Sequence, residues 1–108
     1  MQNNMDIEKG FYYHYKHDPS GEINNFAYEV MGIAHHSEIA GLDESAMVMY
    51  RPLYNAPIYQ AGKHWNVRPR AMFTEMVTKN DVNKSRFQKI TDTMILAELE
   101  KIRDAMYN

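Results

Sequence analysis

The sequence predicts a small, mostly β protein: an antiparallel sheet, or a partly open SH3-like barrel, of five or six strands followed by one amphipathic α-helix. Three observations support this fold class. The 108 residues fit one domain. Short runs rich in aromatic and β-branched residues alternate with turn-forming residues up to residue 90. Beyond residue 90 the apolar spacing changes to that of a helix.

Two aromatic runs predict the first two strands. Residues 11–15 read Phe-Tyr-Tyr-His-Tyr and favour a strand, and the Asp-Pro-Ser-Gly that follows at 18–21 favours a turn. Residues 26–34 are the second expected strand. Both of its faces are mostly apolar, so we expect it to be central in the sheet. Gly32 in its interior predicts a bulge or a sharp bend.

The middle of the chain predicts shorter strands that are closed by prolines. Residues 38–45 are expected to form a loop around a glycine. A third strand is expected at 46–51, where Pro52 ends its ability to donate to a ladder. A fourth is expected at 64–68, closed in the same way by Pro69.

The stretch after Pro69 is ambiguous in its periodicity. We interpret residues 71–78 as a single helical turn followed by a strand from about Phe73. The polar residues 79–84 predict a turn, and residues 86–90 predict a last strand.

The clearest pattern is an amphipathic helix at the C-terminus. Thr91 and Asp92 are both good N-cap residues, and no glycine or proline follows them. Apolar residues three and four apart then fall on one stripe: Ile95, Leu99, Ile102 and Met106, with Leu96 beside them. We therefore divide the chain into a flexible N-terminus (1–9), a β domain (10–90) and a helix (91–108) that caps the domain or pairs two subunits in a homodimer.

Composition excludes several classes of protein. The chain has no cysteine, which removes disulfides and thiol chemistry, and its longest apolar runs are too short for a transmembrane helix. The N-terminus is polar and lacks the pattern of a signal peptide, so we expect a cytoplasmic protein. The net charge of −2 does not favour nucleic acid or an anionic membrane, and the short basic stretch at 63–70 is interpreted as a solvated face.

Five short motifs occur in order between Gly10 and Phe87. They are G-x-Y-x-H-Y-K from Gly10, Y-E-V-x-G-x-A-x-H-S-E from Tyr28, V-x-Y-x-x-L-Y from Val48, W-x-V-R-P-x-x-M-F-x-E from Trp65, and R-F at Arg86. Together they resemble the DUF1653 family of small bacterial domains. The resemblance implies a small, mostly β domain and no assigned activity. The connections at 17–25 and 55–63 are longer than that pattern needs, and the C-terminal helix lies beyond it.

Aromatic and basic residues among these motifs predict a binding site. Planar aromatic rings offer stacking faces, and a guanidinium is suited to carboxylate or phosphate. We therefore expect a pocket for a small anionic or nucleotide-like ligand, with no cofactor, formed by Tyr12, His14, Lys16, His36, Glu38, Tyr50, Trp65 and Arg68, with Tyr15 and Tyr54 nearby. The alternative is that the aromatic residues form the core and that Arg68 pairs with Glu29, Glu38 or Glu75.

Two other functions stay open. The first is a protein-interaction or homo-oligomer assembly module that uses the C-terminal helix. The second is a hydrolase in which His36 acts as general base, oriented by Glu38 and close to Ser37. We predict no catalytic residue as the leading interpretation. We also predict no metal site, because the candidate ligands His14, His35, His36, His64 and Glu38 lack a regular ligand spacing.

Overall fold

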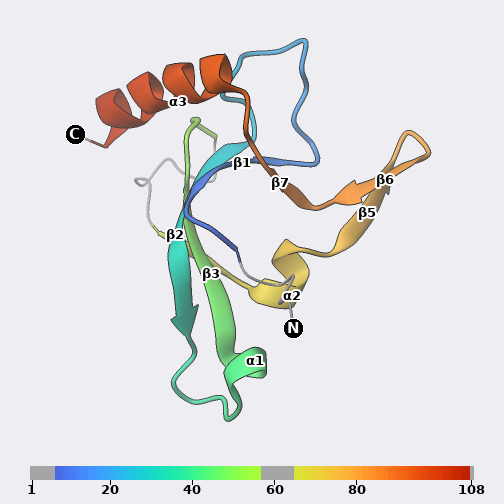
Figure 1. The fold of residues 1–108 in the computed structure, drawn as a ribbon, viewed down its shortest axis with the longest axis vertical. Helices are drawn as coiled ribbons and strands as arrows, with labels where there is room; N and C mark the ends of the chain where they lie inside the picture. Colours follow the sequence, from blue (N-terminus) through green and yellow to red (C-terminus); the bar gives the residue numbers. More distant parts are fainter. Residues whose placement is uncertain (1–6, 57–64, 108) are drawn as a thin grey trace.

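The computed structural model describes residues 7–56 and 65–107, and its main body is a five-stranded antiparallel sheet (Figure 1). The strands lie side by side in the order β4-β3-β2-β1-β7. The expected flexible N-terminus lies largely outside the described residues. The bounds of these strands are β1 Gly10–His14, β2 Ala27–His35, β3 Ala46–Pro52, β4 Asn66–Pro69 and β7 Phe87–Lys89.

The expected mostly β fold, a small antiparallel sheet followed by a C-terminal helix, is confirmed, and the sheet is not closed into a barrel. The outermost strands, β4 and β7, are not joined to each other, so the main sheet keeps two edges. The predicted turn at 18–21 is present, with the Gly21 N–H donating to the Asp18 carbonyl at 3.0 Å. The central place expected for the second strand is also confirmed, because β2 lies between β1 and β3.

Gly32 produces the bulge that the sequence predicts. The pairing of β2 with β3 shifts between Val30 and Gly32, where Val30 lies opposite Tyr50 and Gly32 lies opposite Met49. Gly32 has φ of 150°, a conformation that side chains other than glycine rarely adopt. The extra residue shifts the alternation by one position, so Ile33 points to the same face of the sheet as Val30.

A separate hairpin forms where the sequence predicted a polar turn at 79–84. Strand β5 (Met76–Lys79) pairs with β6 (Val82–Ser85), so four of the six residues of the expected turn lie in strands. The turn itself is made by Asn80 and Asp81, whose φ values of 54° and 65° are left-handed. Such a two-residue turn matches the twist of a hairpin and is one that asparagine and aspartate tolerate well.

Two short helices complete the connections. Helix α1 (Leu42–Ser45) lies in the segment expected to be a loop, immediately before β3. Helix α2 (Arg70–Phe73) is the helical turn expected after Pro69, and the strand after it begins at Met76 rather than near Phe73. Phe73 is 1% exposed and is the residue that α2 contributes to the core.

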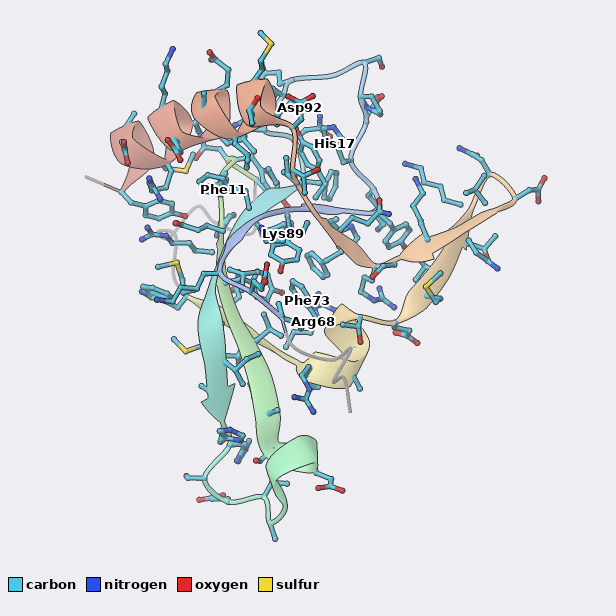
Figure 2. All side chains as sticks on the ribbon, viewed as in Figure 1. Phe11, His17, Arg68, Phe73, Lys89 and Asp92 are labelled. Atoms are coloured by element: carbon cyan, nitrogen blue, oxygen red, sulfur yellow. The ribbon has the colours of Figure 1, made fainter. Side chains whose placement is uncertain are left out.

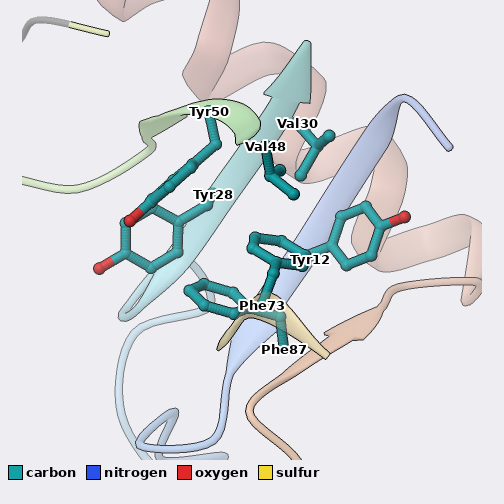
Figure 3. Close-up of a cluster of buried hydrophobic side chains, with 7 residues drawn as sticks. All are labelled: Tyr12, Tyr28, Val30, Val48, Tyr50, Phe73 and Phe87. Atoms are coloured by element: carbon teal, nitrogen blue, oxygen red, sulfur yellow. The ribbon is translucent and has the colours of Figure 1, made fainter. Parts of the chain in front are cut away.

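One face of the sheet carries an aromatic core, which we call the aromatic face (Figure 3). The rings of Phe73 and Phe87 stack at 4.0 Å between centroids, and Phe87 also meets Tyr28 and Tyr50 edge-on. The side chains alternate between the faces along each strand, which is why these residues share one side. The buried cluster comprises Tyr12, Tyr28, Val30, Val48, Tyr50, Phe73 and Phe87.

The other face is covered by the C-terminal helix α3 (Thr93–Met106), so we call it the helix face. The Asp92 side chain caps the helix by accepting from the N–H groups of Met94 and Ile95. The predicted apolar stripe points inward, and Leu99 is fully buried. Its neighbours include Phe11, Ala27, Leu53 and Ile90 from the domain. None of the helices in the described ranges is long and apolar enough to cross a membrane.

An ion-pair network also fastens α3 to the sheet. Glu29, 8% exposed, accepts from the Arg51 Nε at 2.9 Å through one carboxylate oxygen and from Arg103 of α3 at 2.7 Å through the other. The Arg51 guanidinium lies 4.0 Å from the ring centroid of Tyr107, whose hydroxyl donates to the Pro52 carbonyl. The network joins β2, β3 and the helix.

Candidate functional site

Strand register brings part of the predicted site together on the aromatic face. His14 lies opposite Phe87 in the β1–β7 pair, and Arg68 lies opposite Val48 in the β3–β4 pair. Cross-strand partners share a face, so these side chains emerge beside the aromatic core. Tyr50 also projects from β3 on this face.

Arg68 is held by aromatic groups. Its Nε donates to the Tyr50 hydroxyl at 3.3 Å, and its guanidinium carbon lies 5.6 Å from the centroid of the Phe87 ring. The expected alternative was an ion pair with Glu29, Glu38 or Glu75. Within residues 7–56 and 65–107, Arg68 forms no salt bridge; Glu29 pairs with Arg51 and Arg103, and Glu75 with Arg86.

His14 is half-buried at the edge of the same cluster. Its ring lies 5.0 Å from Phe87 and 5.7 Å from Phe26, measured between centroids. The backbone N–H of Lys16 donates to its Nδ1 at 3.2 Å, so the neutral ring carries its proton on Nε2. This arrangement offers one imidazole N–H from the aromatic face.

Burial and four cations disfavour a positive charge on His14. Its pKa falls from 6.5 to about 4, first because burial removes water and then because of the positive charges on Arg68, Lys16, Arg86 and Lys79. Because the positive charges gather around a ring that is itself neutral at pH 7, this part of the surface is suited to an anion.

The tyrosines divide into two groups. Figure 3 shows the hydroxyls of Tyr28 and Tyr50 directed to one side of the cluster and that of Tyr12 to the other. The Tyr28 and Tyr54 hydroxyls share a hydrogen bond of 2.5 Å, whereas the Tyr12 hydroxyl donates to the Glu8 carbonyl at 2.8 Å. Tyr12 thus serves the core, while Tyr50 contacts Arg68.

Trp65 is separated from Arg68 by the sheet. It is 51% exposed and lies against Arg51, whose guanidinium carbon is 5.3 Å from the indole centroid. Arg51 belongs to the helix face, because it lies opposite Glu29. The predicted pocket walled by both Trp65 and Arg68 therefore does not form. The reason is the alternation of side chains along an extended chain.

His36 and Glu38 are also remote from the aromatic face. Both are exposed in the turn that follows β2, at the far end of the β2–β3 hairpin (Figure 1). The backbone N–H of Glu38 donates to the His36 Nδ1 at 3.2 Å. The histidine–serine hydrogen bond in this region instead joins His35 Nδ1 to the Ser45 Oγ at 2.9 Å.

Two cations near His14 were not among the predicted residues. Arg86 precedes Phe87, and Lys79 ends β5, where its ammonium donates to the Tyr15 carbonyl at 3.3 Å. Arg86 was visible only in the R-F motif. Lys79 lies in a segment whose strand pairing the sequence does not reveal. His64, one of the candidate metal ligands, lies outside the described residues; among those described, no three His, Asp or Glu side chains group as metal ligands.

Comparisons with known proteins agree with the motifs. The family model described as "Protein of unknown function (DUF1653)" matches residues 10–89. The match ends at the last residue of β7 and leaves α3 outside it. No curated protein and no solved structure matches the chain.

Proposed function

The chain belongs to the DUF1653 family of proteins of unknown function, and we propose that it is a non-catalytic binding module for a small anionic or nucleotide-like ligand. The ligand would contact the rim of the aromatic face at Arg68, His14 and Tyr50. Trp65, His36 and Glu38 have no part in this proposal because they lie elsewhere. The observation that carries the proposal is the environment of Arg68. Its guanidinium lies among aromatic groups, and no carboxylate of the described residues forms a salt bridge with it.

The state of Arg68 supports anion binding on energetic grounds. Removing a cation from water has a cost that is normally offset by an opposite charge. Among the residues that the structure describes, a hydroxyl and a ring face are the groups that offset this cost for Arg68. A phosphate or carboxylate would supply the missing partner, and the planar guanidinium can hold either through two parallel hydrogen bonds.

His14 supports the same ligand chemistry. Its ring offers a neutral N–H, and the cations near it would attract an anion by the same fields that lower its pKa. A bound anion opposes those fields. The His14 pKa should therefore rise from about 4 when the ligand binds.

The test is a titration of the full chain with adenosine monophosphate, followed by amide and imidazole chemical shifts. Arg68→Ala should weaken binding about tenfold, the loss expected for one charge-assisted contact, with the melting temperature unchanged. Lys101→Ala is the matched control, because Lys101 lies on the outer side of α3 and forms an exposed ion pair with Glu98.

Two results would refute the proposal. If Arg68→Ala lowers affinity and melting temperature together, Arg68 is structural. If adenosine monophosphate shifts no resonance of His14 or its neighbours at millimolar concentration, the aromatic face is not the binding surface.

A further inference from the structure

A cleft lies on the other side of β1 from His14. It has a volume of about 370 Å³, within the range of pockets that hold small molecules. Its walls come from β1 and the turn that follows it, from β7, and from the β5–β6 hairpin: Tyr13, His17, Gln88, Lys79, Val82 and Lys84. None of these residues belongs to the predicted site. Figure 2 shows His17 near the start of α3, well apart from Arg68 near Phe73.

One wall of this cleft is fixed by stacking and hydrogen bonds. The rings of Tyr13 and His17 are nearly parallel, 3.5 Å between centroids and 13° between planes. The Tyr13 hydroxyl donates to the Ile23 carbonyl at 2.5 Å, and the His17 Nδ1 donates to the Asn25 carbonyl at 2.7 Å. Both rings are therefore held before any ligand arrives, which lowers the entropic cost of binding.

The opposite wall is cationic. Lys79 and Lys84 both line the cleft, and neither forms a salt bridge with any residue in 7–56 or 65–107. Lys79 is anchored by its bond to the Tyr15 carbonyl, and an ammonium has two further protons to donate. One carboxylate, Asp18, interacts electrostatically with Lys79, and it accepts hydrogen bonds from the N–H and the hydroxyl of Ser20.

The hairpin that carries both lysines has a regular strand pairing and a tight turn. Lys84 lies opposite Val77, and the left-handed turn at Asn80 and Asp81 closes the strands tightly. Val82 and Pro19 add apolar surface to the cleft, and Gln88 adds an amide from the sheet edge. The cleft thus combines two positive charges with an apolar wall.

We propose that this cleft binds a phosphate monoester with a compact apolar body. Two lysines lining one cavity favour a doubly charged group over a single carboxylate, and the apolar wall would receive the body of the ester. This site goes beyond the function proposed above, since it uses the opposite side of β1 and does not involve Arg68.

The experiment titrates the isotope-labelled full chain with phenyl phosphate and follows backbone amide shifts. We expect saturable shifts at His17 and Gln88. Lys84→Gln should weaken binding about fivefold, as expected for one contact with a charged group near the surface. Lys101→Gln, which removes an exposed charge from α3, should leave it unchanged. Inorganic phosphate and phenol should each bind more weakly than phenyl phosphate.

Three outcomes would overturn the proposal: no saturable shift at the cleft, equal affinity in Lys84→Gln and the parent chain, or inorganic phosphate binding as tightly as phenyl phosphate. Lys84→Gln is preferred to a change at Lys79, because Lys79 also affects His14. Arg68→Ala separates the two sites: it should weaken binding of adenosine monophosphate at the aromatic face about tenfold and leave phenyl phosphate binding unchanged.

Discussion

The two faces of the sheet differ in whether their charged side chains are paired. On the helix face, Glu29 lies between Arg51 and Arg103, so two cations share one buried carboxylate. On the aromatic face, Arg68 meets a hydroxyl and a ring, and more cations gather around a neutral His14. Breaking a buried ion pair is costly, so the charges of the helix face should act on stability. The excess of positive charge on the aromatic face is the feature on which the proposed binding site depends.

The difference begins in the register of the strands. Glu29 lies opposite Arg51, so the cross-strand pair is complementary within the sheet. Arg68 lies opposite Val48, which offers it no charge. The comparison therefore predicts that changes on the helix face act on stability, and that charge changes on the aromatic face act on binding and pH dependence.

The largest effect is expected from a change in the buried aromatic cluster, which tests whether this cluster stabilises the fold independently of Arg68 and the cations around His14. Phe87→Ala should lower the free energy of unfolding by about 3–5 kcal/mol, because the ring is buried against Phe73, Tyr28 and Tyr50. Urea denaturation measures the loss. A cost below about 1 kcal/mol would mean that the aromatic core repacks freely.

Leu99→Ala tests the helix face in the same assay. The side chain is fully buried between α3 and the sheet, so its removal should cost about 2–4 kcal/mol. Met94→Ala is the control on the same helix, because Met94 is 79% exposed and should cost less than about 0.5 kcal/mol. Equal costs for the two variants would show that α3 does not pack as described.

Glu29→Gln tests the ion-pair network. The change keeps the shape of the side chain but leaves Arg51 and Arg103 without their shared charge, which should cost roughly 2 kcal/mol in unfolding free energy. Glu98→Gln removes an exposed ion pair with Lys101 and should cost at most about 0.5 kcal/mol. If Glu29→Gln alters adenosine monophosphate binding and leaves stability unchanged, the comparison of the two faces is wrong.

The smallest expected effect is a pH dependence that originates in His14. Its folded pKa of about 4 lies below the unfolded value of 6.5, so the unfolded chain binds more protons between these pH values. Stability should therefore fall as the pH drops from 6.5 towards 4. The loss should be about 1–2 kcal/mol, allowing for solvent screening of a half-buried ring.

Urea denaturation at several pH values measures this slope. His14→Gln should flatten it, whereas His36→Ala should leave it unchanged, because His36 is exposed at the far end of the β2–β3 hairpin. An unaltered slope in His14→Gln would assign the pH dependence to other groups.

Local patterns were enough to predict most of the fold. Asp92 was a predicted cap of α3 and is the cap, since a helix start depends on residues close in sequence. Gly32 was predicted at a bulge for a similarly local reason. Strand β6 was missed because Asn83, Lys84 and Ser85 have low strand preference, and its formation depends on pairing with β5.

The site was harder to predict because it depends on pairing between distant strands. Trp65 and Arg68 are close in sequence, yet three residues of separation along an extended chain place them on opposite faces. Lys79 is brought near His14 by the placement of a separate hairpin, and no local sequence pattern encodes that placement. Pairing of two subunits through α3 stays a prediction.

The link between Arg103 and Glu29 reaches from beyond the family match into its centre. In relatives that lack a comparable helix, the acid at this position would lose a partner. Positions 29, 51 and 103 should therefore covary across the family. In an alignment of relatives with and without the helix, a change at one of these positions should be accompanied by changes at the others.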